Sequence, residues 1–181
     1  MRALSTADLI EQNDKAQNQA TRLGSLAVRA LIEEVELTPK PALVDQHGPG
    51  AHTDLSLMLM RCSAHCLRPS FELMALASFR QIPNQTLRED LGAIGRWAEQ
   101  SMLLTTGGAN THRGAIWTLG LLVSAAAMGA TSPDAVAYRA RQLACLPDWS
   151  AGSRIQGSGG DRRLDRRAAS DRQRESGEGG R

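Results

Sequence analysis

The stretch GAIWTLGLLVSAAAMGA, residues 114–130, constrains the fold more than any other part of the chain. It is apolar on all sides of a helix for 17 residues, and such a helix is either buried in a protein core or spans a membrane. Its three glycines, its serine, its threonine and the lack of a basic cluster beyond either end favour the core. We therefore expect a central buried helix with other helices packed around it.

Helical periodicity precedes this stretch, and no stretch in the first 150 residues alternates with period two over a useful length. Ser5 is expected to cap a helix that runs to about Leu37, with a weak point at Gly24. Asp54 is expected to cap a second helix, and Pro69 to open a third. The packed face of the first helix is expected to hold Leu23, Leu26, Ala27, Ala30, Leu31, Glu34 and Leu37.

The later helices have their own end signals. Thr86 and Glu89 fit a capping box before an amphipathic helix that ends near the glycines at 107 and 108. Ser132, followed by Pro133, predicts a last helix that ends at Leu146. The chain is therefore expected to be all-α, with one multi-helix, orthogonal or bundle-like domain over residues 1–150.

Composition changes near residue 150. Residues 151–181 hold 8 arginines, 5 acidic residues and few apolar side chains, so we expect a disordered tail there. Only 3% of residues are aromatic, and no basic stripe runs along the earlier helices, which argues against nucleic acid binding outside the tail. The N-terminus turns polar after ten residues, unlike a secretory signal, so a cytoplasmic protein without a membrane segment is expected.

The three cysteines, Cys62, Cys66 and Cys145, form no CxxC pair. Cys62 and Cys66 lie four apart beside His65, a spacing that a metal site would also use. Because no second ligand pair follows, buried reduced thiols are the favoured interpretation. The sequence leaves the oligomeric state open, with a homodimer as one alternative.

The segment LTPKPALVDQHGPGAHTDL, residues 37–55, interrupts the helices with more than turn residues. Lys40 lies between two prolines, which restrict its backbone and so the region that its ammonium group reaches. Asp45, His52 and Asp54 follow, and carboxylates beside a histidine suit Mg²⁺ or acid and base chemistry on a hydroxyl. The alternative is that Asp54 only caps a helix and that His52 is a surface residue.

A second irregular segment, TTGGANTHRGA, covers residues 105–115. Two glycines free the backbone, and Asn110 or Thr111 is expected to cap the next helix, whose first N–H groups favour an anion. His112 and Arg113 lie where the helix dipole opposes positive charge, a cost that a bound phosphate would offset. The alternative is a plain glycine turn with a surface histidine and arginine, since neither common phosphate-loop pattern is present.

Together the two segments resemble one family. EVELTPKPALVD, GAHTDL, AEQSM and TGGANTHRGAIWTLGLL, within residues 34–122, are similar to the signature blocks of triphosphoribosyl-dephospho-CoA synthases, in their order and at suitable spacing. These blocks span about half of the chain. One variant of the family serves citrate lyase and one serves malonate decarboxylase, and RARQLACLPD, residues 139–148, looks more like the latter.

The resemblance implies a pentosyl transfer. The 2′-hydroxyl of 3′-dephospho-CoA attacks the ribose C1 of ATP, adenine leaves, and the triphosphate stays attached. The product is the precursor of the prosthetic group of the acyl carrier protein of malonate decarboxylase or citrate lyase. Such a reaction needs cations and donors for a triphosphate, a base for the attacking hydroxyl, and stabilisation of an oxocarbenium-like centre.

The resemblance also implies roles for individual residues. The phosphates are assigned to Lys40, Arg113 and the turn of Gly107, Gly108, Asn110 and Thr111. Asp45 and Asp54, with Glu34 or Glu99, are the candidates for binding Mg²⁺ or activating the hydroxyl, with Asp45, Asp54 and Glu34 as the metal set. His52 and His112 are candidates for giving adenine its proton or for binding a phosphate, and the sequence does not choose between them.

Two features depart from the family pattern. Ala42 stands where the family usually has glycine, which adds a methyl group at a close turn. After Trp149 the chain passes into arginine and glycine without periodicity, whereas family members continue with further helices, so a truncated or frame-shifted sequence is expected. An inactive remnant that still binds a nucleotide or CoA is therefore the alternative to an active transferase, and a helical interaction module with a basic tail is a third.

Overall fold

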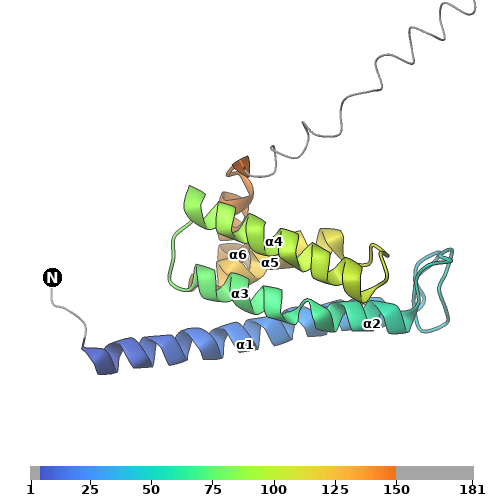
Figure 1. Ribbon diagram of the computed structural model, residues 1–181, viewed down its shortest axis with the longest axis horizontal. Coiled ribbons are helices and arrows are strands. Elements are labelled where there is room, and N and C mark those ends of the chain that lie inside the picture. The colour runs from blue at the N-terminus through green and yellow to red at the C-terminus, as the bar shows by residue number, and fades with distance from the viewer. Residues whose placement is uncertain (1–4, 150–181) are drawn as a thin grey trace, which may run out of the picture. The chain divides into compact units, whose positions relative to one another are not determined.

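The computed structural model describes residues 5–149, and all of their regular structure is helical (Figure 1). This confirms the predicted all-α class for the described part of the chain. Residues up to Pro147 form one compact unit. Its helices are α1 (Thr6–Glu36), α2 (Leu57–Cys66), α3 (Arg68–Ser78), α4 (Gln85–Thr105), α5 (Arg113–Ala127) and α6 (Pro133–Ala144). The predicted tail and the predicted domain boundary at residue 150 lie outside the described residues or at their edge, and stay predictions.

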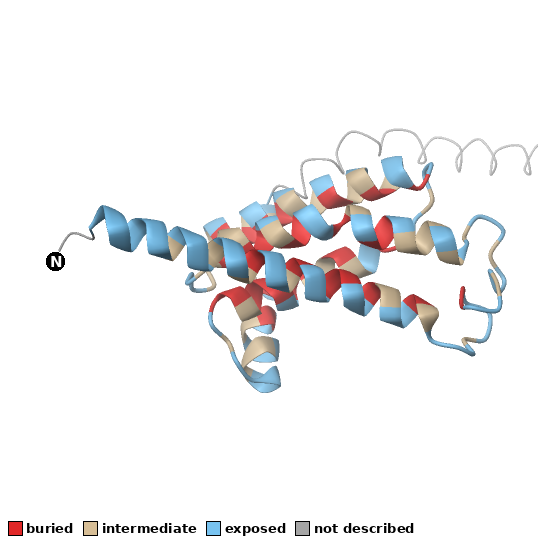
Figure 2. Cartoon of the chain, turned by 90° about the horizontal axis from the view of Figure 1, so that it is seen from below, coloured by how far each residue is buried: buried red, intermediate tan, exposed pale blue. Residues whose placement is uncertain are grey.

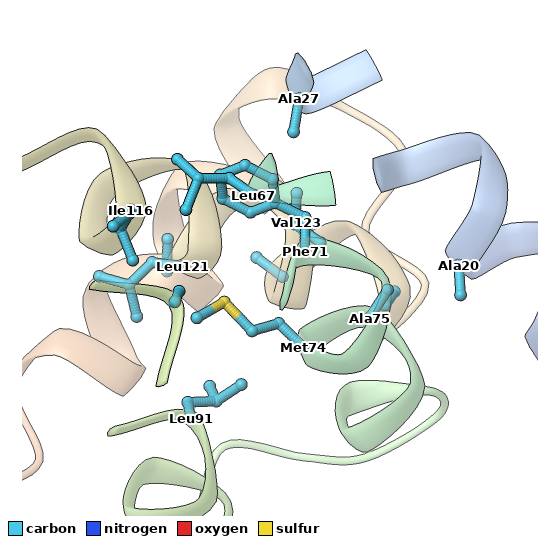
Figure 3. Close-up of a cluster of buried hydrophobic side chains, with 14 of the residues drawn as sticks. Ala20, Ala27, Leu67, Phe71, Met74, Ala75, Leu91, Ile116, Leu121 and Val123 are labelled. Carbon is cyan, nitrogen blue, oxygen red and sulfur yellow. The ribbon is translucent and has the colours of Figure 1, made fainter. Parts of the chain in front are cut away.

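Helix α5 is the central helix, as its apolar sequence predicts. It packs against α1, α3, α4 and α6. Met74 of α3 lies in the core cluster together with Leu91, Ile116 and Leu121 (Figure 3). Close approach matters here, because a Cβ at Gly120 would lie 2.5 Å from the Met74 sulfur. No helix among residues 5–149 is both long enough and apolar enough to cross a bilayer.

Helix α1 packs along only part of its length. Its first turns are exposed and the buried positions begin at Ala20, after which the helix lies against α3 and α2 (Figure 2). The predicted face was partly wrong, since Leu26 is 38% exposed and Leu37 is 61% exposed. The buried positions are Ala20, Gly24, Ala27, Val28, Leu31 and Val35. Apart from Leu31, small residues and valines make this face, and at Gly24 a Cβ would lie 2.5 Å from the Glu72 side chain of α3.

The helix ends follow capping chemistry, but sequence did not always select the right residue. Ser5 and Ser132 cap α1 and α6 as predicted. Asp54 does not cap α2, because Ser56 accepts the Leu59 N–H at 3.2 Å instead. A capping box at Thr86 and Glu89 is also wrong.

Asn84 begins α4 two residues earlier, with its side-chain oxygen 2.9 Å from the Leu87 N–H. Asparagine and serine cap helices as well as aspartate and threonine do, so local sequence permits either start and packing decides.

The three cysteines are free thiols, but they are not all buried as predicted. Cys62 and Cys145 are exposed, and Cys66 is partly buried. Cys62 lies on the side of α2 opposite to its buried residues Ser63 and Ala64. Within residues 5–149, no group of three or more histidine, cysteine and acidic side chains is placed to hold a metal ion.

Candidate active site

A pocket of about 600 Å³ lies between the C-terminal part of α1 and the N-terminal end of α5. This volume falls in the range of small-molecule sites. Its lining residues are Ala30, Leu31 and Glu34 from α1, Met60 from α2, and Asn110, Thr111, His112, Arg113, Gly114, Ala115, Thr118 and Leu119 from α5 and the turn before it. The second irregular segment therefore forms one wall of the pocket, and the end of α1, from which the first segment starts, forms the other.

The start of α5 differs in detail from the sequence expectation. His112 is the N-cap residue and caps nothing with its own side chain. The Asn110 side-chain oxygen accepts the Arg113 N–H at 3.3 Å, so Asn110 and not Thr111 does the capping. The His112 N–H meets the Met102 sulfur at 3.2 Å. Two of the N–H groups expected to be open to an anion thus have partners already.

The glycine turn is similarly occupied. Gly107 and Gly108 have φ values of 64° and 97°, which glycine adopts without strain. The Gly108 N–H donates to the Leu103 carbonyl at 2.8 Å and so closes the end of α4. A phosphate role for the Gly107 and Gly108 amides stays a prediction, and it would require the Gly108 amide to leave this bond.

His112 is the most unusual side chain of the pocket wall. It is 5% exposed, and its Nδ1 lies 2.9 Å from the Ser63 hydroxyl. Its Nε2 is buried and meets no hydrogen-bonding group among the described residues. Burial lowers the pKa of the imidazole, and the nearby Glu34 carboxylate opposes that shift. The ring is therefore neutral near pH 7, with one nitrogen still to be satisfied.

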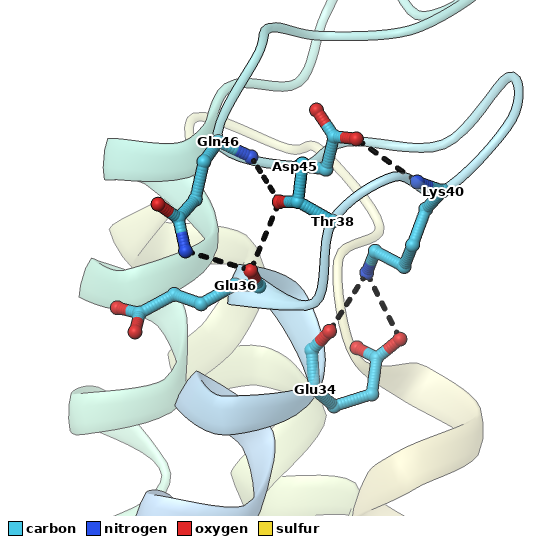
Figure 4. A network of polar contacts seen from close by, with 6 residues as sticks. All are labelled: Glu34, Glu36, Thr38, Lys40, Asp45 and Gln46. Carbon is cyan, nitrogen blue, oxygen red and sulfur yellow. Dashed lines mark hydrogen bonds and ion pairs between the residues drawn. The ribbon is translucent and has the colours of Figure 1, made fainter.

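Both predicted cations are paired with carboxylates. The Lys40 ammonium donates to the Glu34 carboxylate and to the Glu34 carbonyl, each at 3.0 Å (Figure 4). Arg113 pairs with Glu99 of α4 at 2.5 Å. Lys40 is mostly buried, with 15% of its side chain exposed, whereas Arg113 is 56% exposed. Of these four residues, Glu34 and Arg113 line the pocket, and Lys40 and Glu99 lie beside it as their ion-pair partners.

The loop from Leu37 to Ser56 is ordered around Asp45. Its carboxylate accepts the Lys40 N–H at 2.9 Å and the His47 N–H at 2.7 Å, and Asp45 is 6% exposed. The Lys40 N–H is the main reason that the pKa of Asp45 is lowered, and burial acts in the opposite direction. Asp45 therefore fixes the loop that carries Lys40, and its catalytic or metal-binding role stays a prediction.

The C-terminal end of α1 anchors the same loop. Thr38 and the Gln46 side chain both donate to the Glu36 carbonyl, at 3.0 Å and 2.8 Å (Figure 4). The Glu36 carboxylate receives the Arg61 Nε–H of α2 at 2.8 Å. The bonds from Thr38 and Gln46 satisfy the Glu36 carbonyl, which the end of the helix leaves without an intrahelical partner. As a result, the loop returns to the helix from which it starts.

His52 and Asp54 lie further along the loop, away from the residues that line the pocket. They face each other at 4.0 Å, and the Asp54 side chain is 68% exposed. The three predicted metal ligands Asp45, Asp54 and Glu34 therefore do not gather as one set. The sequence suggested one set because the three residues lie within about twenty positions of each other. Residues that are close in sequence around a loop need not be close in space. Their assigned roles stay predictions.

Ser63 is a site residue that sequence reasoning missed. It is fully buried in α2, and its hydroxyl lies 2.6 Å from the Thr111 hydroxyl as well as 2.9 Å from His112. No signal in the sequence marks it, because a lone serine on an apolar helix usually only packs. Met60, which also lines the pocket, was missed for the same reason.

Comparison with known proteins identifies the family of the chain. A model of the CitG family, described as ATP:dephospho-CoA triphosphoribosyl transferase, matches residues 20–174. Because the match covers most of the chain, the protein belongs to the ATP:dephospho-CoA triphosphoribosyl transferase family. No solved structure matches the chain.

Curated relatives carry the corresponding name. A probable 2-(5''-triphosphoribosyl)-3'-dephosphocoenzyme-A synthase of Pseudomonas fluorescens is 60% identical over 133 residues, which are 71% of this chain and 45% of the relative. A protein of the same name from Pseudomonas savastanoi is 53% identical over 156 residues, 84% of this chain and 53% of the relative. The 2-(5''-triphosphoribosyl)-3'-dephosphocoenzyme-A synthase of Klebsiella pneumoniae is 50% identical over 135 residues, 74% of this chain and 48% of that protein. The chain spans about half the length of these relatives.

Ala42 provides a test of the loop. Its φ of 64° is left-handed, which costs a non-glycine residue roughly 1–2 kcal/mol. Ala42→Gly removes this strain and adds roughly 0.5–1 kcal/mol of backbone entropy cost. We expect a net gain of up to about 1 kcal/mol in the free energy of unfolding, measured by urea denaturation. Gly50→Ala is the matched control and should lose stability, because its φ is 62° and its Cβ would lie 2.5 Å from the Leu43 carbonyl. A loss of stability in Ala42→Gly would contradict this loop conformation.

The pKa of His112 gives a second test. The folded state resists protonation of this ring, while the unfolded ring titrates near 6.5. The stability that neutral His112 contributes is therefore present above pH 6.5 and is lost as the pH falls through the lower, folded pKa. We expect an NMR titration to place the His112 pKa below 6.5, with the resonance assigned by its loss in His112→Gln. That variant should also lose less stability than the wild type on acidification. Titration at or above 6.5 would show that the ring is not buried as described.

Proposed function

We propose that this chain acts in the synthesis of 2'-(5''-triphosphoribosyl)-3'-dephospho-CoA from MgATP and 3'-dephospho-CoA. The 2′-hydroxyl of dephospho-CoA forms a bond to the ribose C1 of ATP, the bond from C1 to adenine breaks, and the hydroxyl proton is released. Adenine takes up a proton as it leaves, and the triphosphate stays on the transferred ribose. The product is the prosthetic-group precursor for the acyl carrier protein of malonate decarboxylase or of citrate lyase.

One observation supports this proposal above the others. The family segments TPKPALVD and TGGANTHRGA lie far apart in the sequence, yet the second lines the pocket and the first meets it through Lys40, which pairs with the pocket residue Glu34. Arg113 lies on the opposite wall. Two cations at one pocket suit a triphosphate, and arginine in particular suits the planar fork of phosphate oxygens.

The resting ion pairs give the proposal a binding mechanism. Lys40 and Arg113 are already held in place by Glu34 and Glu99, so little side-chain entropy remains to be lost when a phosphate arrives. The triphosphate then exchanges with the carboxylates as the partner of each cation. Glu34 and Glu99, once released, are available to the Mg²⁺ that accompanies ATP, since magnesium is usually held by one or two carboxylates together with substrate phosphates.

The neutral His112 contributes a donor or an acceptor without adding charge. It lines the same pocket as Arg113 and an apolar wall of Ala30, Leu31 and Leu119. This apolar wall suits a nucleoside, whose base and sugar prefer partial exclusion of water. We assign Asp45 to the ordering of the Lys40 loop. Asp54 keeps its predicted role toward Mg²⁺ or the attacking hydroxyl, and His52 its predicted role toward adenine or a phosphate.

The direct test is release of adenine. The full chain is incubated with ATP, Mg²⁺ and 3'-dephospho-CoA, and adenine is measured by liquid chromatography. Lys40→Gln and Arg113→Gln should each lower kcat/KM by roughly 10- to 100-fold, since each removes a charge-assisted contact worth about 1.5–3 kcal/mol.

Two matched variants serve as controls. Lys15→Gln and Arg29→Gln also remove a cation from a lysine–glutamate and an arginine–glutamate pair, but these pairs are exposed on α1 and outside the pocket lining. They should leave the rate unchanged. Binding of ATP without adenine release would support the alternative of an inactive nucleotide-binding chain. Equal effects of Lys40→Gln and Lys15→Gln on kcat/KM would show that Lys40 does not bind the substrate.

A further inference from the structure

Ser63, Thr111 and His112 form a chain of hydrogen bonds beneath the pocket. The Ser63 hydroxyl joins two elements, because it reaches the Thr111 hydroxyl at 2.6 Å and the His112 Nδ1 at 2.9 Å. Ser63 is fully buried, and His112 is 95% buried by its 5% exposure. Because water does not reach the buried Ser63 hydroxyl, it does not compete with these two hydrogen bonds, and the hydroxyl is held in place.

Two arrangements join all three groups and use the single hydrogen of the Ser63 hydroxyl. In the first, Thr111 donates to Ser63, Ser63 donates to Nδ1, and the ring hydrogen is on Nε2. In the second, Nδ1–H donates to Ser63, Ser63 donates to Thr111, and Nε2 has a lone pair. Each arrangement fixes one tautomer of a neutral ring, because Ser63 has a single hydrogen to give.

The charge around the pocket selects the first arrangement. Nδ1 faces Ser63 on α2, so Nε2 is the ring nitrogen that meets the other surroundings of His112. Glu34, which lines the same pocket, carries a negative charge whose influence reaches the ring. A nearby carboxylate favours an N–H over a lone pair.

We propose that Ser63 is a positioning residue that relays the Thr111 hydroxyl to His112 Nδ1 and holds the ring in its Nε2–H tautomer. His112 then presents a neutral donor to an acceptor atom of the nucleotide in the pocket. This use of the donor rests on the proposed function, whereas the tautomer does not. Nε2 is enclosed by the described residues of the resting pocket and has no partner there, and a buried donor without a partner costs about 1–3 kcal/mol. A nucleotide that displaces a neighbouring side chain and brings an acceptor to Nε2 removes this cost.

The wild-type protein tests the relay without any substitution. The full chain is labelled with ¹⁵N-histidine, and long-range ¹H–¹⁵N correlations are recorded at pH 7.5. His112→Gln assigns the signals among the four histidines of the chain. We expect a single His112 pattern with hydrogen on Nε2 and a bare Nδ1. A ring with hydrogen on Nδ1, or with the averaged shifts of two tautomers, would overturn the proposal.

Three variants separate positioning from packing. Ser63→Ala should give averaged shifts for His112 and lower the rate of adenine release roughly five- to tenfold, as expected for one lost hydrogen bond. Ser63→Thr keeps the hydroxyl and should restore the single tautomer. Thr111→Val removes only the first donor and should leave Ser63 bonded to Nδ1. An unchanged tautomer in Ser63→Ala would overturn the relay, and if that variant does not fold, the wild-type spectrum alone decides.

The two proposals fail in different ways. If the Nε2–H pattern is found but no adenine is released, the relay stands and the proposed function is wrong. If adenine is released by a protein whose His112 has hydrogen on Nδ1, the function stands and the relay is wrong.

Discussion

The burial of α5 is the constraint on which the rest of the structure depends. A helix without a polar face cannot lie on a surface, so α1, α3, α4 and α6 must cover it. Its N-terminal end is therefore fixed against the C-terminal part of α1, where the pocket lies. A turn that would otherwise be an ordinary surface connection becomes one wall of a site, and His112 becomes a buried residue.

Charge balance at the pocket follows from this arrangement. The pocket meets the positive end of α5, and two cations lie beside it, so repulsion would weaken the fold if carboxylates were absent. Glu34 and Glu99 supply them by pairing with Lys40 and Arg113. Because these pairs are partly exposed, each contributes little to stability, and a stronger anion can replace the carboxylates at modest cost. The same contacts thus stabilise the resting site and leave it open to exchange.

The sequence allowed prediction of the helices and of the two segments at the site, but not of the contacts within it. The unbroken apolar stretch identified α5, and Ser5 and Ser132 marked the starts of α1 and α6, because burial and capping are local effects. The grouping of Asp45 and Asp54 with Glu34 was not recovered, since loop geometry depends on bonds such as that from the Lys40 N–H to Asp45. Ser63 could not be predicted from the sequence, because its role comes from its contacts with Thr111 and His112, which lie outside α2. The departure at Ala42 was recognisable only through the family pattern. The left-handed φ at this position explains why the family usually has glycine there.

In the proposed site, one pocket serves both segments. The most direct measurement is a titration of the ¹⁵N-labelled chain with MgATP, in which amide shifts are followed residue by residue. We expect residues 38–46 and 107–115 to shift along one common binding curve, while the exposed turns of α6 stay unchanged. Shifts confined to one of the two segments, or two separate binding curves, would contradict a shared site.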